Sequence, residues 1–159
     1  MHIRILAVGK TKEKYIELGI KEYAKRLQPY ARLEIVTVGE EKLKDNLSTR
    51  EEEQIRAREG EQLLKGIKPD EYVIVLDIKG KALSSEDLAR QLSNLALYGN
   101  SAIVFIIGGA LGLAPEVINR ADITLSLSPL TFTHQMVRLI LVEQLYRAFK
   151  IMRGEPYHR

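Results

Sequence analysis

The sequence contains no cysteine and only three histidines among its 159 residues. The lack of cysteine excludes disulfide bonds, thiolate metal sites and a cysteine nucleophile, and it is compatible with a reducing compartment. Because the histidines are few and none are spaced as H-x-x-x-H, we expect no zinc and no other bound metal. The chemistry of this chain must therefore depend on other residue types.

Long apolar runs are missing as well. No stretch approaches the ~20 apolar residues that are needed to cross a bilayer. Residues 1–8 form a short, mostly apolar stretch that runs directly into Gly9-Lys10-Thr11-Lys12, without the long apolar segment and cleavage site of a signal peptide. We therefore expect a soluble, cytoplasmic protein. Its length suggests one domain over residues 1–159.

Neither sign of charge dominates the chain as a whole. It has 24 Lys and Arg against 21 Asp and Glu, a formal net charge of +3 and a pI of about 9.1. A pI above about 9 is a first hint of nucleic-acid binding. Residues 40–61 are rich in acid, so the basic excess lies elsewhere, notably in the segment from Arg138 to the C-terminus.

Apolar periodicity predicts five strands that alternate with five helices. The strands are expected at residues 1–8, 31–38, 72–78, 102–107 and 123–127, and the helices at 13–27, 48–65, 84–96, a short one from 115, and 134–152. The runs 73–76 and 102–107 are apolar throughout, as in parallel strands covered on both faces. This alternation predicts an α/β fold with a mostly parallel sheet flanked by helices. The second helix has few apolar residues, so we expect it to be peripheral.

Three predicted strand ends could form a binding site, because ligands of open α/β sheets bind at the carboxyl ends of strands. These ends are residues 76–80, 107–113 and 127–132. Gly108, Gly109 and Gly112 let the backbone turn sharply and approach a ligand closely, although their spacing is not that of a dinucleotide or phosphate loop. A plain strand-to-helix turn is the alternative. The hydroxyls of Ser128 and Thr131 suit either adenosine recognition or a tight turn.

The last predicted helix places a charge on its apolar face. On a helical wheel, Arg138 lies within about 40° of Val142, Leu145 and Phe149. A buried guanidinium needs a partner, which could be a carboxylate of the same chain, another subunit or a substrate phosphate. Snorkelling from the helix N-terminus is the alternative.

The C-terminal residues Tyr157, His158 and Arg159 combine groups that could stack on a base, transfer a proton and contact a phosphate. A solvated terminus is the alternative. His134 and His158 could each act as a base near neutral pH. At the start of a helix, His134 could equally be a capping or packing residue.

Four C-terminal segments carry a resemblance. They are FIIGGALGL (105–113), LSLSPLTFTHQMVR (125–138), EQLYRA (143–148) and RGEPYH (153–158). In this order, and with ILAVGK at residues 5–10, they resemble the bacterial methyltransferases that modify N3 of a pseudouridine in 23S ribosomal RNA, a family of the SPOUT class. The resemblance covers the whole chain. Two positions depart from the family pattern, which more often has serine at Ala110 and proline at Thr133.

The resemblance implies a single-domain SPOUT fold with a C-terminal deep trefoil knot, and a homodimer with the last helix at its interface. It implies S-adenosylmethionine as methyl donor, no metal, and 23S rRNA within the large subunit or assembled 70S ribosome as substrate. The residues that match the family's cofactor contacts are Leu76, Gly108, Leu127, Ser128, Pro129, Leu130, Thr131 and Phe132.

The resemblance also implies that Tyr157, His158 and Arg159 serve substrate recognition and catalysis. His158 is then the first candidate base for N3, and Arg159 could stabilise the developing anion or hold a phosphate. His134 and Arg138 are expected at an RNA or dimer interface.

Two other readings compete with this one. A conventional Rossmann-type methyltransferase would have a glycine-rich loop after the first strand, where residues 8–11 contain a single glycine. A non-enzymatic, ribosome-associated RNA-binding module would explain the basic tail but not the glycine loop.

Overall fold

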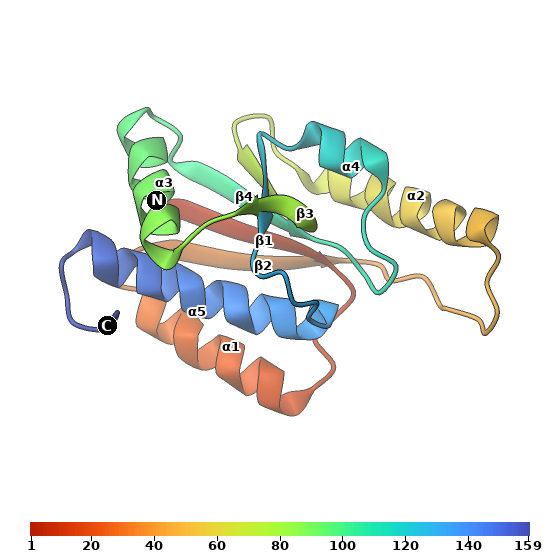
Figure 1. Cartoon of the computed structure of the whole chain (residues 1–159), viewed down its shortest axis with the longest axis horizontal. Helices are drawn as coiled ribbons and strands as arrows, with labels where there is room; N and C mark the ends of the chain where they lie inside the picture. Colours follow the sequence, from red (N-terminus) through yellow and green to blue (C-terminus); the bar gives the residue numbers. More distant parts are fainter.

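The computed structural model describes all residues, 1–159, and its strands and helices alternate along the chain (Figure 1). The strands are β1 (His2–Val8), β2 (Arg32–Val38), β3 (Tyr72–Ala82), β4 (Ala102–Ile107) and β5 (Ile123–Ser126). The helices are α1 (Lys14–Leu27), α2 (Thr49–Gly66), α3 (Ser85–Leu97), α4 (Pro115–Arg120) and α5 (His134–Met152). The predicted order of elements is confirmed, and the last helix begins and ends at the predicted residues.

The five strands form one parallel sheet in the order β2-β1-β4-β3-β5. Helices α1, α3 and α5 cover one face, and α2 and α4 cover the other. The pleat divides the strand residues between the two layers: in β4, Ile103 and Phe105 face the first group of helices, and Val104 and Ile106 face the second. This confirms that the apolar strands lie in a sheet covered on both faces.

Helix α2 is the peripheral element that its composition predicts. Its inner side buries only Ile55, Glu59, Gly60 and Leu63. Ser48 caps its first turn, because the Ser48 side chain accepts the backbone N–H of Glu51 at 3.1 Å. None of the helices is long and apolar enough to cross a membrane.

Strand β3 is longer than predicted and bends around β5. Leu125 of β5 is paired with Leu76 and also with Lys81, so residues 77–80 pass around the strand. A Cβ atom on Gly80 would lie 2.7 Å from the backbone carbonyl carbon of Leu125, and therefore only glycine fits at this crossing.

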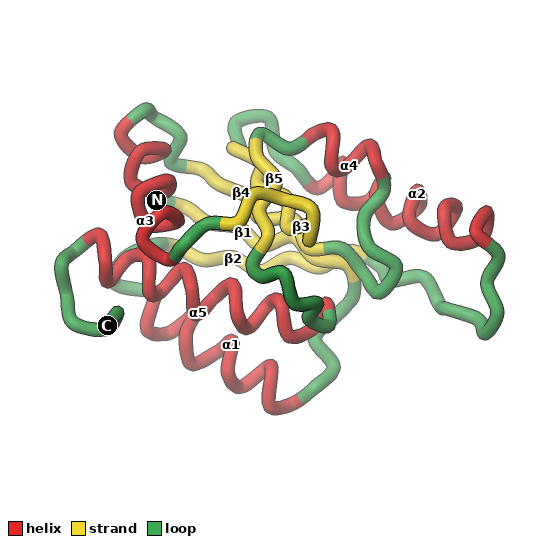
Figure 2. Tube along the Cα trace, viewed as in Figure 1, coloured by secondary structure: helices red, strands yellow, loops and turns green.

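The chain that leaves β5 passes behind this extension of β3 before it enters α5 (Figures 1 and 2). It then returns across the sheet, where α5 packs between α1 and α3. The C-terminal segment is thus threaded under a loop, as in the knotted fold that the resemblance implies.

Candidate functional site

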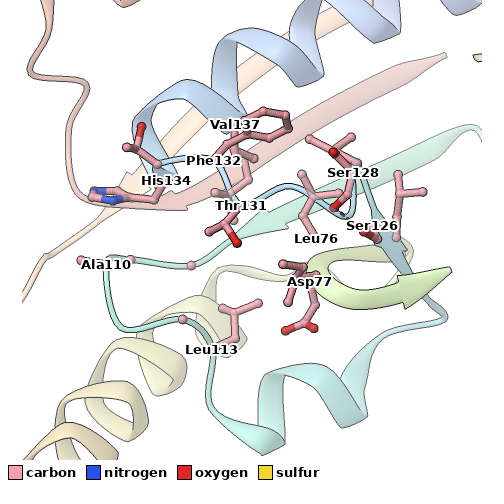
Figure 3. A pocket seen from close by; sticks show the side chains of 18 of the residues that line it. Leu76, Asp77, Ala110, Leu113, Ser126, Ser128, Thr131, Phe132, His134 and Val137 are labelled. Carbon is pink, nitrogen blue, oxygen red and sulfur yellow. Dashed lines mark hydrogen bonds between the residues drawn. The ribbon is translucent and has the colours of Figure 1, made fainter. Parts of the chain in front are cut away.

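A cavity of about 450 Å³ lies at the carboxyl ends of β3, β4 and β5, next to the first turn of α5 (Figure 3). Its volume lies within the range typical of small-molecule sites. The lining is mostly apolar and consists of Leu76, Asp77, Ile78, Ile107, Gly108, Gly109, Ala110, Gly112, Leu113, Leu125, Ser126, Leu127, Ser128, Leu130, Thr131, Phe132, Thr133, His134 and Val137. The three strand ends singled out in the sequence therefore meet at one site.

All of the residues expected to contact a cofactor line this cavity, with the exception of Pro129. Within the turn, the Ser126 hydroxyl donates to the backbone carbonyl of Ser128 at 3.2 Å, and the Ser128 hydroxyl accepts the N–H of Leu130 at 2.9 Å. The hydroxyls of both serines thus hold the turn in shape, whereas Thr131 is exposed at the cavity. Both readings of this segment, a tight turn and a binding surface, are compatible with its geometry.

Thr133, one of the two departures from the family pattern, caps α5. Its side-chain oxygen accepts the N–H of Met136 at 3.2 Å. The helix begins one residue later, with His134 at the edge of the cavity.

The glycine loop closes the cavity on the side of β4. A Cβ atom on Gly108 would lie 2.9 Å from the side chain of Leu113, and Gly112 has a φ of +82°, which favours glycine. The N–H of Gly112 donates to the carbonyl of Gly109 at 3.1 Å and makes the turn tight. These glycines let the backbone of the loop approach the cavity closely, as a ligand-binding loop requires.

Helix α2 supports the glycine loop from outside, which its peripheral character did not predict. The Arg56 guanidinium donates to the carbonyl of Leu111 at 3.3 Å. The buried carboxylate of Glu59 lies beside Gly109 and accepts the N–H of Glu41 at 3.4 Å. Burial raises the pKa of Glu59.

Arg138 is buried, as its place on the apolar face of α5 predicts, with 1% of its surface exposed. Its guanidinium donates to the carbonyl of Val8 at 2.6 Å and to that of Gly9 at 2.8 Å. Its partners within the chain are therefore backbone carbonyls at the end of β1, so the expected carboxylate of the same chain is wrong. A contact of Arg138 with a second subunit or a phosphate stays a prediction. Burial lowers the pKa of Arg138. The hydrogen bonds of its side chain link α5 to the end of β1.

His134 lies at the edge of the cavity, with its Nε2 atom 3.7 Å from a carboxylate oxygen of Glu40. Burial, followed by the positive charge of Arg138, lowers the pKa of His134 and thus favours the uncharged ring. The adjacent Gln135 side chain accepts the N–H of Lys12 at 3.1 Å and donates to the carbonyl of Lys10 at 3.0 Å. These contacts hold the start of α5 against the loop after β1.

The C-terminal tail is ordered against α5 and α3, which argues against a frayed terminus. The Tyr157 ring packs edge-on against Tyr146 with their centroids 4.8 Å apart, and its hydroxyl donates to Glu143 at 3.0 Å. His158 places Nε2 at 2.7 Å from the Glu86 carboxylate. Burial first, and then hydrogen bonds to neighbouring oxygens, raise the pKa of Tyr157.

None of the tail residues lines the cavity. Glu143, the partner of Tyr157, lies nine residues beyond His134 on α5, which corresponds to ~14 Å along the helix. Arg159 is exposed. The structure thus brings the expected cofactor contacts together but keeps the expected catalytic residues apart from them within one chain.

No group of three or more His, Asp or Glu side chains that could hold a metal ion occurs in the structure. Sequence reasoning did not single out Asp77, whose carboxylate lies in the cavity. The signal that could have found it is its position directly after Leu76 at the bend of β3.

A cavity at three adjacent strand ends, walled by a threaded C-terminal segment, is the site of a knotted α/β methyltransferase. The family described as "Predicted SPOUT methyltransferase" matches residues 1–158, and the chain belongs to this family.

Similar full-length proteins carry one curated name, ribosomal RNA large subunit methyltransferase H. The chain is 56% identical to the protein of that name from Clostridioides difficile and 55% identical to those from Halothermothrix orenii and Alkaliphilus oremlandii. Each comparison covers 100% of both chains.

Proposed function

We propose that residues 1–159 form one methyltransferase domain that transfers a methyl group from S-adenosylmethionine to N3 of a pseudouridine in 23S ribosomal RNA. The observation that carries the proposal is the cavity of about 450 Å³, at which the bend of β3 and the segments at the ends of β4 and β5 meet. The ribosomal substrate follows the curated name of the full-length relatives, and a ribosomal substrate supports a cytoplasmic location in this proposal.

The residues of the cavity fit S-adenosylmethionine. Apolar side chains such as Leu76, Leu127 and Phe132 suit the flat adenine ring, and exposed backbone groups of the 127–132 turn and of Gly108 suit its polar edge. S-adenosylmethionine supplies an activated methyl group bound to a sulfonium. The contribution of the protein is then mainly to hold the two reactants in line.

The tail residues supply the proton chemistry in this proposal. N3 of the pseudouridine must lose a proton, and His158 is the base that accepts it. The carboxylate of Glu86, 2.7 Å from Nε2, orients the imidazole. Arg159 holds a phosphate or the developing anion, and Tyr157 offers a ring for a base to stack on.

The separation of tail and cavity within one chain supports a homodimer in which the tail of one copy completes the cavity of the other. Helix α5 itself offers little free surface, because each of its residues from His134 to Ile151 is buried or half-buried in the single chain. Exposed apolar side chains do lie at the mouth of the cavity, where Leu130 is 72% and Ile78 is 53% exposed. A second copy would cover such a surface.

The substrate is an assembled large subunit or 70S ribosome in this proposal. A chain of this size, with a net charge of +3, offers little basic surface for reading an isolated RNA. The test is to incubate the protein and labelled S-adenosylmethionine with naked 23S rRNA, large subunits or 70S ribosomes. We expect methylation of assembled particles and little or none of naked RNA.

The alternative, a non-enzymatic RNA-binding module, is tested by calorimetry with S-adenosylmethionine. The proposal requires saturable binding at one cavity per chain. Binding to ribosomes without any affinity for S-adenosylmethionine would favour the module instead.

A further inference from the structure

The cavity contains one carboxylate to which the contacts proposed above give no role. Asp77 lies at the bend of β3, directly after Leu76, and is half-buried. Among the residues that line the cavity, only Asp77 and His134 carry titratable side chains. Asp77 is the only acidic side chain on the cavity wall, and the lowered pKa of His134 favours its uncharged ring.

Asp77 is not paired with a basic side chain. One carboxylate oxygen accepts the N–H of Lys79 at 2.8 Å, and the other makes no hydrogen bond within the chain. In Figure 3 the carboxylate lies on the side of the cavity that faces Leu113, below Leu76 and Thr131. A carboxylate without a basic partner at the wall of a mostly apolar cavity can form a charge-assisted hydrogen bond with a cationic group of a ligand, so this position fits a ligand with a positive charge.

We propose that Asp77 binds the α-ammonium group of S-adenosylmethionine, an inference that rests on the proposed function. The other positive charge of this ligand is the sulfonium, which is lost as the methyl group leaves. A carboxylate at the sulfonium would stabilise the reactants more than the transition state and would slow the reaction. The ammonium keeps its charge throughout, and a carboxylate there strengthens binding without opposing catalysis.

This assignment has a kinetic signature. An interaction that is equal in the ground state and the transition state changes KM and leaves kcat unchanged. Removal of the Asp77 charge therefore raises KM for S-adenosylmethionine, while kcat at saturation stays that of the unaltered protein. A carboxylate that acted as the base for N3 would show the opposite pattern.

The test compares three ligands by calorimetry with the intact protein and its Asp77→Asn variant. Asparagine retains a side-chain oxygen to accept the Lys79 N–H, which preserves the local turn. S-adenosylmethionine has both the ammonium and the sulfonium, S-adenosylhomocysteine has only the ammonium, and methylthioadenosine has neither. Asp70→Asn, an exposed aspartate outside the cavity, is the matched control.

We expect Asp77→Asn to weaken the binding of S-adenosylmethionine and of S-adenosylhomocysteine by the same factor. This factor should be about tenfold or more, as for the loss of a charge-assisted hydrogen bond. Binding of methylthioadenosine and all binding by the control should stay unchanged. Weaker binding of S-adenosylmethionine alone would assign the contact to the sulfonium and overturn the proposal. An equal loss of affinity for all three ligands, or no loss for any of them, would also overturn it. If the unaltered protein binds none of them, the proposed function itself fails.

Discussion

At the scale of the residue, Gly80 lies where β3 passes close to the backbone of β5. A Cβ atom there would meet the backbone of Leu125 and Thr124 at 2.7–2.8 Å, and backbone atoms cannot rotate away as a side chain can. Gly39, in contrast, has no atom within 4 Å of the Cβ position.

We predict that Gly80→Ala lowers the free energy of unfolding by about 1–3 kcal/mol, as expected for overpacking. Gly39→Ala should leave it unchanged or raise it by up to about 1 kcal/mol, because alanine restricts the unfolded chain. Equilibrium urea unfolding followed by circular dichroism measures both values. Equal effects of the two substitutions would show that the crossing is not tight.

Glu59 gives stability a dependence on pH. Burial raises its pKa, so the folded protein binds this proton more tightly than the unfolded chain does. The resulting stabilisation is complete below the unfolded pKa of about 4.3 and is lost as the pH rises through the folded value. Glu59→Gln cannot titrate and keeps a side-chain oxygen for the Glu41 N–H.

We therefore predict that Glu59→Gln gains stability relative to the unaltered protein as the pH increases from about 4 to 7. Glu53→Gln, at an exposed position of the same helix, is the control and should show no such trend. Melting temperatures across this range provide the measurement. If the melting temperatures of the protein and of its Glu59→Gln variant change in parallel with pH, the pKa of Glu59 is not raised in the folded protein.

At the scale of the element, Arg138 connects the knotted helix to the sheet. Its two short hydrogen bonds satisfy the carbonyls of Val8 and Gly9 at the end of β1. Loss of the guanidinium would leave buried acceptors without donors.

We predict that Arg138→Met destabilises the protein by about 2–4 kcal/mol, because two buried carbonyls lose their donor and each such loss costs about 1–3 kcal/mol. Arg90→Met removes an exposed arginine that is paired with Asp87 on α3, and it should change stability by less than about 1 kcal/mol. Chemical denaturation distinguishes the two. A small effect at Arg138 would mean that water replaces the guanidinium.

The sequence was sufficient to predict most elements, because apolar periodicity reports burial on each face directly. It missed the last residues of β3, since Lys79, Gly80 and Lys81 have no strand pattern and pair with β5 only because the chain bends around it. It predicted that Arg138 is buried but not its partners, because backbone carbonyls leave no mark in a residue pattern. The strand ends of the cavity were predictable from topology, whereas the support from α2 is a tertiary contact.

At the scale of the whole molecule, a complete active site requires two copies of the chain in the proposed function. The cavity contains no residue of the tail, and Tyr157 and His158 are held by α5 and α3 of their own chain. Two variants separate the contributions: deletion of residues 154–159 removes the tail, and Thr131→Trp places a large ring in the cavity.

We predict that each variant alone is inactive and that a mixture of the two, after exchange of subunits, regains activity. The truncated chain contributes an intact cavity and the Thr131→Trp chain an intact tail, so each mixed dimer has one complete site. Methyl transfer to ribosomes measures this. No recovery, with mixed dimers demonstrated by mass spectrometry, would contradict a site shared between copies.

The most direct test of the central claim is to map the methyl group itself. The protein and S-adenosylmethionine are incubated with two samples of 70S ribosomes that lack the methyl group. One sample contains the pseudouridines, and the other comes from cells that cannot form them and has uridine instead. The 23S rRNA of both samples is then analysed by mass spectrometry. The account predicts one new methyl group, on N3 of a pseudouridine, and none in the ribosomes that have uridine there. A methyl group on another atom, equal methylation of uridine, or no methylation of either particle would contradict it.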